Sequence, residues 1–410
     1  MTLRQGRGGP VLAYSLPSPQ GLWSALVYRW GDAFQLVGHQ QLWQEVLAPA
    51  RLNMAQALAL QAWLTHPTGS PGSLLKLRPR HLPAPTDASL LAALSTLMAA
   101  ADAVPAYAPE DPACLGPGEA LNTWHAQYQR LWKSPRPVLW YLVHGVDALL
   151  LGNAKSWLLW GGVQQVASQF NGLEAPSSAH AKLATYRTDR TQGPRASLAC
   201  PASLIQRDRS YRHNDPNRAF FEGLGLGGLY HNGYLELQRG TRPLLEAALK
   251  LLPERLGQLR LLAQTGQLWT SHTGPRPGPV DITQVFTAAP SFQHAPSPPL
   301  PDSVEGQLCA ALVVGQYEAL GEFAAVKASM DFRTADNPLP LHVTLLGQGA
   351  FRNPPMTMQK ALQRLSEVLQ GHEVRVYVHC WSQSDLQLAR ACLDKANVAH
   401  KDMEPGDFYA

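Results

Sequence analysis

The stretch LHVTLLGQGAFRNPPMTMQKALQRLSEVLQGHEVRVYVHC, from Leu341 to Cys380, decides the fold class of this chain. Its first residues are apolar and β-prone, and the run ends at Gly347 and Gly349. Two prolines follow that suit the first turn of a helix, and from Met358 the apolar residues recur at helical spacing. Residues 374–378 form another short apolar run with β-prone residues. The stretch therefore predicts a βαβ unit with parallel strands and a right-handed crossover.

The loop between the first strand and the helix is the candidate ligand site. In a βαβ unit this loop brings backbone N–H groups together with the positive end of the helix dipole, which favours anions. Glycine at positions 347 and 349 lets the backbone approach a diphosphate closely. The alternative is a plain strand-to-helix turn without a ligand, because a short glycine loop is a weak signal by itself.

Several segments resemble one family in the expected order. LGQGAFRNPP resembles the second phosphate loop of macrodomains, the ADP-ribose-binding family. Upstream, Gly152-Asn153-Ala154 and Gly161-Gly162-Val163 are similar to a degraded Asn-Ala-Ala-Asn…Gly-Gly-Gly-Val signature of the poly-ADP-ribose-glycohydrolase-like branch. The other matching segments are VASQFNGLE (166–174), TDRTQGPRASLAC (188–200), ITQVFTAAP (282–290) and GQYEALGEFAAV (315–326). The resemblance covers roughly the last 270 of the 410 residues.

The resemblance extends to a MavL-type group of bacterial effector ADP-ribosylhydrolases, and the chain departs from the wider branch in two places. The glycohydrolase signature ends in Gln-Glu-Glu with catalytic glutamates, which nothing in this chain reproduces, and the glycine triplet is reduced to Gly161-Gly162. The resemblance therefore implies ADP-ribose binding rather than cleavage of poly-ADP-ribose chains.

The implied fold is a three-layer α/β/α macrodomain with a mixed sheet over residues 131–410. Residues 1–130 are expected to form a mostly helical N-terminal region of unknown role. Residues 40–64 and 87–101 are Ala/Leu-rich and helical in pattern, whereas residues 22–36 mix aromatic and β-prone residues.

Composition narrows the classes of partner and compartment. The net charge of +4 is small and scattered, which argues against a nucleic-acid partner. The five cysteines are widely spaced and include no CxxC pair, which favours reduced thiols over disulfides or a zinc site. The N-terminus lacks the apolar core of a secretory signal, and no apolar run approaches a membrane span. We expect a cytoplasmic protein, or one delivered into a host cell without a cleavable signal, with no membrane partner, metal or cofactor.

Two further motifs are interpreted as structural features rather than ligand sites. GLGLGG (223–228) satisfies G-x-G-x-x-G, but LYHNGYLELQ after it alternates like a hairpin around Asn232-Gly233, so a Rossmann site is rejected. Arg207, Arg209 and Arg212, with His213, form a basic cluster that we interpret as a solvated loop face rather than a phosphate site.

The resemblance implies roles for individual residues. The diphosphate of ADP-ribose would rest on the backbone of Gly347, Gly349, Ala350 and Phe351 and on the Gly161-Gly162 turn. Phe351 would cover the distal ribose, with Asn153 and Asn171 bonding its hydroxyls. The remaining expected binding residues are Gln169, Phe170 and Asn353.

Glu174 and Asp189 are the candidate catalytic residues, because a carboxylate can stabilise an oxocarbenium-like transition state and deprotonate the attacking water. Asp281, Asp302 and Glu318 are the next candidates. The favoured function is removal of mono-ADP-ribose from a modified protein side chain, with arginine linkage implied by the resemblance. A non-catalytic reader of ADP-ribosylated proteins and an enzyme acting on free ADP-ribose derivatives are the alternatives.

Overall fold

The computed structural model describes residues 118–144, 161–174, 186, 191–198, 204, 207–208, 210–271, 278–403 and 407, together with four N-terminal strands. Those strands form an antiparallel sheet in the order β1-β2-β3-β4. Their bounds are Thr2–Gly6, Gly9–Ser15, Ser24–Trp30 and Ala33–Val37. The last two fall where the sequence mixes aromatic and β-prone residues. The helices expected at 40–64 and 87–101 lie outside the described residues.

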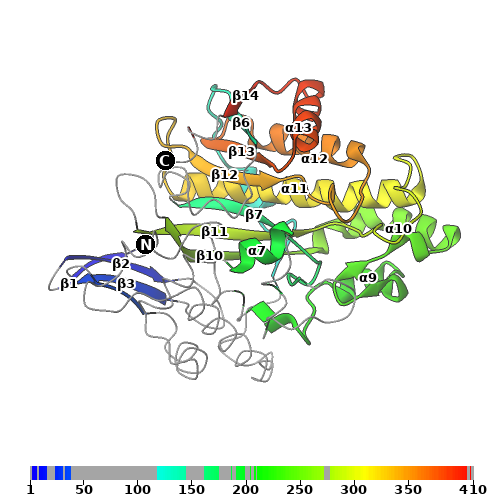
Figure 1. Cartoon of the computed structure of the whole chain (residues 1–410), viewed down its shortest axis with the longest axis horizontal. Helices are drawn as coiled ribbons and strands as arrows, with labels where there is room; N and C mark the ends of the chain where they lie inside the picture. The colour runs from blue at the N-terminus through cyan, green and yellow to red at the C-terminus, as the bar shows by residue number, and fades with distance from the viewer. Residues whose placement is uncertain are drawn as a thin grey trace.

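The main body is built on a mixed eight-stranded sheet in the order β14-β6-β13-β12-β7-β11-β10-β5 (Figure 1). All neighbours from β14 to β11 are parallel, whereas β10 and β5 add antiparallel strands at one edge. In chain order the strands are β5 (Glu119–Ala120), β6 (Leu139–His144), β7 (Gly162–Ser168), β10 (Arg260–Ser271), β11 (Gly278–Ala288), β12 (Leu339–Thr344), β13 (Val374–Cys380) and β14 (His400–Met403).

Helices pack against both faces of this sheet. The described helices are α5 (His125–Tyr128), α7 (Gln192–Leu198), α9 (Arg218–Gly223), α10 (Arg242–Arg255), α11 (Val304–Met330), α12 (Pro355–Leu369) and α13 (Gln383–Lys395). The crossovers β11-α11-β12, β12-α12-β13 and β13-α13-β14 all step toward the same edge, so right-handed connections place these three helices on one face. On the opposite face the Gln284 side chain donates to the Ala196 carbonyl of α7. The expected three-layer α/β/α architecture with a mixed sheet is confirmed.

The βαβ unit predicted from residues 341–380 is present as β12, a loop, α12 and β13. β12 pairs in parallel with β13 from Leu339 opposite Val374 to Thr344 opposite His379. Pro355 occupies the start of α12, and the buried side of that helix carries the apolar residues whose spacing predicted it. The strand begins two residues earlier than the sequence pattern indicated, because Leu339 also pairs in the sheet.

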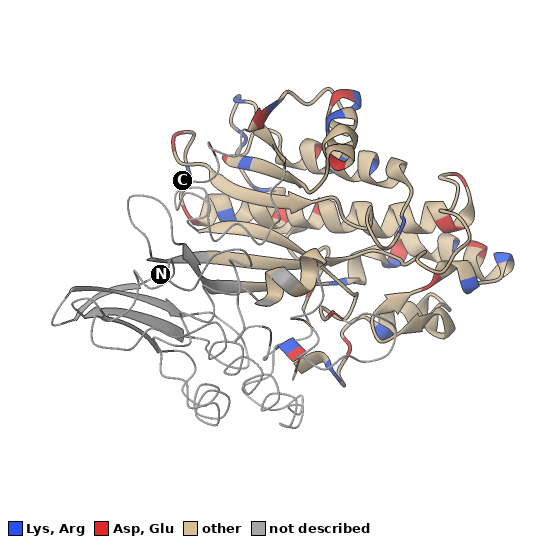
Figure 2. Ribbon diagram, viewed as in Figure 1, with Lys and Arg blue, Asp and Glu red and all other residues tan. Residues whose placement is uncertain are grey.

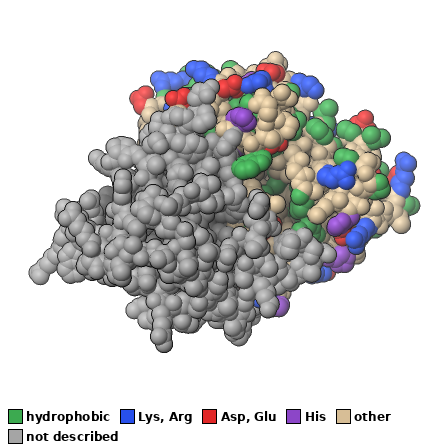
Figure 3. All heavy atoms as spheres, viewed as in Figure 1, with side chains coloured by type: hydrophobic (Ala, Val, Ile, Leu, Met, Phe, Trp, Pro, Cys, Tyr) green, Lys and Arg blue, Asp and Glu red, His purple; other side chains and the backbone are tan. Residues whose placement is uncertain are grey.

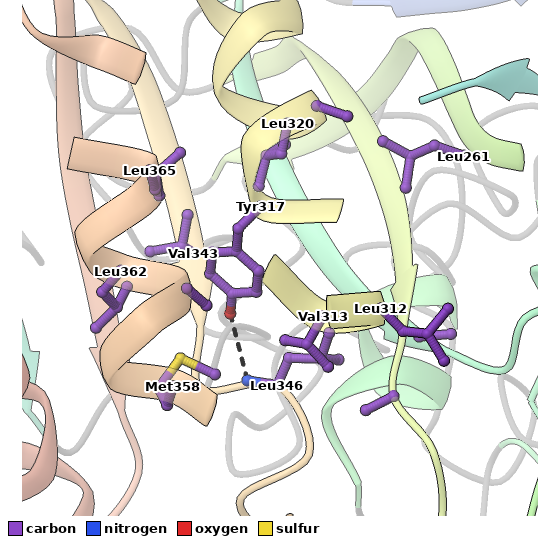
Figure 4. Close-up of a cluster of buried hydrophobic side chains, with 14 of the residues drawn as sticks. Leu261, Leu312, Val313, Tyr317, Leu320, Val343, Leu346, Met358, Leu362 and Leu365 are labelled. Atoms are coloured by element: carbon purple, nitrogen blue, oxygen red, sulfur yellow. Dashed lines mark hydrogen bonds between the residues drawn. The ribbon is translucent and has the colours of Figure 1, made fainter. Parts of the chain in front are cut away.

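The central helix α11 corrects one expectation. It is long and apolar enough to cross a membrane, although the sequence suggested that no apolar run approached that length. Most of its apolar window is buried inside the fold, where Leu312, Val313 and Leu320 join the core between the helices and the sheet (Figure 4). α11 is therefore accounted for as the core helix of the domain.

Charged side chains lie mainly on helices and loops, whereas the strands of the main sheet carry few (Figure 2). On the visible described surface, basic and acidic side chains are interspersed (Figure 3). This mixing agrees with the small net charge of +4.

Candidate functional site

The centre of the sheet has a natural ligand position where β7 and β12 separate. Their backbone pairing is confined to Leu341 with Val163 and His342 with Gln164, although both strands continue beyond this point. The chain leaves β12 toward β13 and leaves β7 toward β10, so the connections from the carboxyl ends of these two neighbouring strands run in opposite directions. In open α/β sheets ligands bind outside the carboxyl ends of the strands at such a switch point.

The loop after β12 lies at this edge and presents its backbone outward. Gly349 and Ala350 are exposed, and Phe351 is half-buried. A Cβ built on Gly349 would meet no atom within 4 Å. Among the contacts of the described residues, the amide N–H groups of Gly347, Gly349, Ala350 and Phe351 have no hydrogen-bond acceptor. Backbone donors concentrated in one exposed turn suit an anion.

The base of the loop is held by buried side chains. Gly347 has a φ of +76°, and a Cβ there would overlap the Asn353 side chain. Asn353 is buried and donates through Nδ2 to the Pro290 carbonyl at 2.7 Å, while its Oδ1 accepts from the Cys309 thiol at 3.3 Å. These contacts hold the base of the loop, and the expectation that Asn353 touches the ligand stays a prediction.

Tyr317 connects the core helix to the same loop (Figure 4). Its hydroxyl donates to the Thr344 carbonyl at 2.5 Å and accepts from the Leu346 N–H at 3.4 Å. Burial raises the pKa of Tyr317 well above its usual value, so the hydroxyl stays protonated and able to donate. The beginning of the loop is therefore fixed by α11 from beneath.

The turn after β7 faces the same edge, and most of its side chains point inward. Gln169, Phe170 and Asn171 are all buried. Phe170 makes an edge-to-face contact with Phe221 at 4.9 Å between ring centroids and belongs to the core, and its expected part in ligand binding stays a prediction. Asn171 Oδ1 accepts from the Leu173 N–H at 3.1 Å, so Asn171 closes the turn from within.

The hairpin predicted around Asn232-Gly233 covers this turn. β8 (Tyr230–His231) pairs with β9 (Tyr234–Leu235), and both turn residues have positive φ. The Gly233 carbonyl accepts from the Phe170 N–H at 3.0 Å. The GLGLGG stretch before it runs from the end of α9 into a short 3-10 turn, which confirms rejection of the Rossmann interpretation.

Glu174 is the candidate catalytic residue that the structure describes at this edge. It is half-buried, and its backbone N–H donates to the Tyr186 hydroxyl at 2.7 Å. Its carboxylate packs directly against Gly193 of α7, where a Cβ would overlap both Glu174 Oε1 and the Ala167 carbonyl oxygen. Glu174 thus lies beside the carboxyl end of β7, while Asp189 and Asn153 lie outside the described residues.

The structure does not bring the Gly161-Gly162 turn to this site. Gly162 is the first residue of β7 and pairs with Ile282, whereas Ser168 at the other end of β7 pairs with Ala288. The strand rises about 3.3 Å per residue, so the two ends are roughly 20 Å apart. A Cβ on Gly161 would overlap the Arg333 side chain at the amino edge of the sheet. The expectation that both glycine turns hold one diphosphate is therefore corrected.

The basic cluster contains a buried cation that the sequence interpretation missed. Arg207 is 1% exposed and donates to Gly172 O, Gln264 Oε1 and Ser197 Oγ, each at 2.8 Å. Its guanidinium also stacks over the Phe286 ring at 3.8 Å. The solvated interpretation is wrong for Arg207, because these contacts tie the turn before Glu174 to α7, β10 and β11.

The remaining acidic candidates for catalysis are not placed at the Gly347 loop by the structure. Glu318 pairs with Arg364 of α12 at 2.5 Å in a partly exposed contact between α11 and α12. Asp302 is exposed beside the start of α11, and the side chain of Asp281 is outside the description. Among the described residues no group of three or more His, Cys, Asp or Glu side chains is placed to hold a metal ion. Cys309, Cys380 and Cys392 are buried free thiols.

A separate pocket of about 250 Å³ lies between α5, α11 and α12, away from the Gly347 loop. Its floor is the buried carboxylate of Glu322, which pairs with His125 Nδ1 at 2.5 Å. Arg364 and Lys133 line it as well. The carboxylate and the basic groups largely neutralise one another, so the pocket favours neither a cation nor an anion.

Comparison with known proteins gives distant structural similarity. No protein-family model and no curated protein sequence matches the chain. One similar solved structure is the poly(ADP-ribose) glycohydrolase of Deinococcus radiodurans in complex with ADP-ribose, 14% identical with a TM-score of 0.36, covering 73% of this chain and 97% of that one. Another is the Oceanobacillus iheyensis macrodomain with MES bound, 13% identical with a TM-score of 0.25, covering 57% and 84%. Similarity at this level establishes no family, and the architecture rests on the strand order itself.

Proposed function

We propose that this protein is an ADP-ribosylhydrolase that removes mono-ADP-ribose from a modified protein side chain. The observation that carries the proposal is the exposed loop at Gly347–Phe351, with unengaged amide N–H groups, at the edge that also carries Glu174. The resemblance of LGQGAFRNPP to a macrodomain phosphate loop supports ADP-ribose as the ligand.

The binding step uses the backbone of the loop. The open space at Gly349 admits the two phosphates of ADP-ribose against the N–H groups, and the half-buried Phe351 ring borders the same turn. Tyr234 contacts Phe351 at 5.6 Å between ring centroids and supports that ring. The distal ribose then extends toward the end of β7, where Glu174 stands.

The chemical step breaks the bond between the anomeric carbon of the distal ribose and the side-chain nitrogen or oxygen of the target. Water attacks the anomeric carbon as that bond breaks, and a carboxylate takes a proton from the water and stabilises the oxocarbenium-like charge. The leaving group is protonated as it departs. We assign the base to Glu174 or Asp189 and favour an arginine-linked substrate, which the MavL-type resemblance implies.

The decisive experiment measures release of free ADP-ribose from arginine-, serine- and glutamate-linked protein substrates. We compare the wild type with Glu174→Gln and Asp189→Asn, because an amide keeps the shape of the carboxylate but cannot act as a base. We expect the wild type to act on the arginine linkage and at least one variant to lose roughly a hundredfold in rate while still binding ADP-ribose.

Three outcomes separate the alternatives. Binding of ADP-ribose by the wild type without release from any linkage would identify a reader module. Release unaffected by both substitutions would move the catalytic carboxylate to another residue. Calorimetry without ADP-ribose binding at millimolar concentration would overturn the proposal as a whole.

A further inference from the structure

The open edge of β7 is completed by a side chain rather than by a strand. Beyond the point where β7 and β12 part, the Gln192 Oε1 accepts from the Ala167 N–H at 2.7 Å. The Gln192 Nε2 donates to the Gln165 carbonyl at 3.2 Å. One primary amide thus reproduces the donor and acceptor that a neighbouring strand would present to two alternate residues of β7.

The β12 side of the gap between β7 and β12 is also held by a glutamine side chain. Gln165 Oε1 accepts from the Thr344 N–H of β12 at 3.0 Å, and its Nε2 donates to Thr287 Oγ1 at 3.0 Å. Glutamine side chains therefore satisfy backbone groups of both β7 and β12 where direct pairing has ended. The separation of the two strands is a built feature, because these buried and part-buried backbone groups keep their hydrogen bonds.

The residue after Gln192 ties this anchor to the proposed active site. Gly193 lies so close to the Ala167 carbonyl oxygen and to Glu174 Oε1 that no side chain fits there. Gln192 and Gly193 begin α7, so the amide contacts with β7 set how that segment lies against the Glu174 carboxylate.

We propose that Gln192 is a positioning residue for the hydrolase reaction: its amide locks the start of α7 onto β7 and thereby holds Glu174 in place. This inference rests on the proposed function for its kinetic consequence. The structural part, the lock between Gln192 and β7, is independent of any ligand.

The lock needs a group that donates and accepts at the same time. Glutamine does so at every pH, and protonated glutamic acid has the same shape with one donor and one acceptor. Ionised glutamate accepts from Ala167 N–H but cannot donate to the Gln165 carbonyl, and it adds a negative charge beside Glu174. Methionine has similar length and does neither.

The test compares Gln192→Glu and Gln192→Met with the wild type between pH 5 and pH 8. The first readout is amide hydrogen exchange of the 162–174 peptide, with each variant compared with the wild type at the same pH. The second is kcat and KM for release of ADP-ribose from the linkage on which the wild type acts. The matched control is Gln363→Glu, which makes the same chemical change on the exposed side of α12.

The contact with the Gln165 carbonyl needs the protonated acid and Glu174 lies close by, so both should raise the pKa of the introduced carboxyl above the ordinary glutamate value. We therefore expect Gln192→Glu to approach the wild type near pH 5 and to lose about tenfold or more in kcat by pH 8, with KM little changed. Its 162–174 peptide should exchange faster at pH 8 as well. Gln192→Met should be impaired at both pH values, and Gln363→Glu at neither.

Wild-type exchange and kcat in both Gln192 variants at pH 8 would overturn the lock and the positioning role together. Faster exchange with wild-type kcat would confirm the lock and overturn the positioning role. If the wild type releases ADP-ribose from no linkage, the proposed function and the positioning role are both overturned. The hydrogen-exchange measurement would then still show whether Gln192 holds α7 against β7.

Discussion

Replacement of Arg207 by methionine should strongly destabilise the domain. The guanidinium is buried, and its three 2.8 Å hydrogen bonds reach Gly172, Gln264 and Ser197 on three different segments. Methionine fills a similar length without any donor, so the three acceptors lose this partner in a place that water does not easily reach.

The expected change in the free energy of unfolding is the difference between opposing contributions. Each buried acceptor left unsatisfied costs about 1–3 kcal/mol, and loss of the stacking over Phe286 adds about 1–2 kcal/mol. Removing a buried charge returns several kcal/mol of desolvation penalty. We therefore expect a net loss of about 3–5 kcal/mol in the free energy of unfolding, because the unsatisfied acceptors and the lost stacking outweigh the recovered desolvation penalty.

The assay is urea unfolding at pH 7 together with the melting temperature, which should fall by about 6–10 °C at roughly 2 °C per kcal/mol. The matched control is Arg364→Met. Arg364 is 41% exposed at its side chain and pairs with Glu318 and Glu367 on the helix surface, so its loss should cost less than about 1 kcal/mol. Equal losses in the two variants, or a loss below about 1 kcal/mol for Arg207→Met, would refute the argument that burial decides the effect.

Three further predictions concern the phosphate loop and the response to acid. Gly349→Val should keep stability within about 0.5 kcal/mol because its Cβ enters open space, yet calorimetry should show loss of ADP-ribose binding; unfolding of this variant would instead make the glycine structural. Gly347→Ala should lose about 1–3 kcal/mol in urea unfolding, since it places a side chain at φ +76° against Asn353; wild-type stability would contradict this. Burial and the charge of Lys133 lower the pKa of His372 to about 4, so the unfolded chain binds a proton below about pH 6.5 that the native state binds only near pH 4. Native stability should therefore fall as pH drops from 6.5 to 4, and His372→Phe should show a smaller melting-temperature difference between pH 7 and pH 4.5; an unchanged difference would exclude this histidine as a source of acid sensitivity.

The local elements of this fold could be predicted because they depend on near neighbours in the chain. The short apolar, β-prone run at 341–346 and the helical spacing after Met358 specify one βαβ unit, and the structure contains it. Asn232-Gly233 predicts its hairpin for the same reason, since both residues tolerate positive φ. The exposed loop at Gly349 is predicted in the same way, because the glycines stand between the strand pattern and the helix pattern.

The composition of the site depended on contacts that no local pattern encodes. A glycine pair has the same sequence pattern at either end of a strand. Only the sheet register showed that Gly161-Gly162 lies at the amino end of the parallel strands and Gly347 at their carboxyl end. A Gln-Phe-Asn turn reads alike whether it faces a ligand or the core, and Phe221 decides that Phe170 is packed away.

The sequence alone determined the order of strands and helices in the βαβ unit, the exposed glycine loop and the hairpin, because periodicity and turn chemistry act over a few residues. The tertiary structure alone decided that Arg207 is buried, that Gln192 completes the edge of β7 and that Glu174 stands against Gly193. Those outcomes come from segments that are distant in the chain and adjacent in space, such as Gly193 and Glu174, which are 19 residues apart, and Arg207 and Gly172, which are 35 residues apart. Hydrogen-bond satisfaction in the core selects such pairings, and it operates only once the chain has folded.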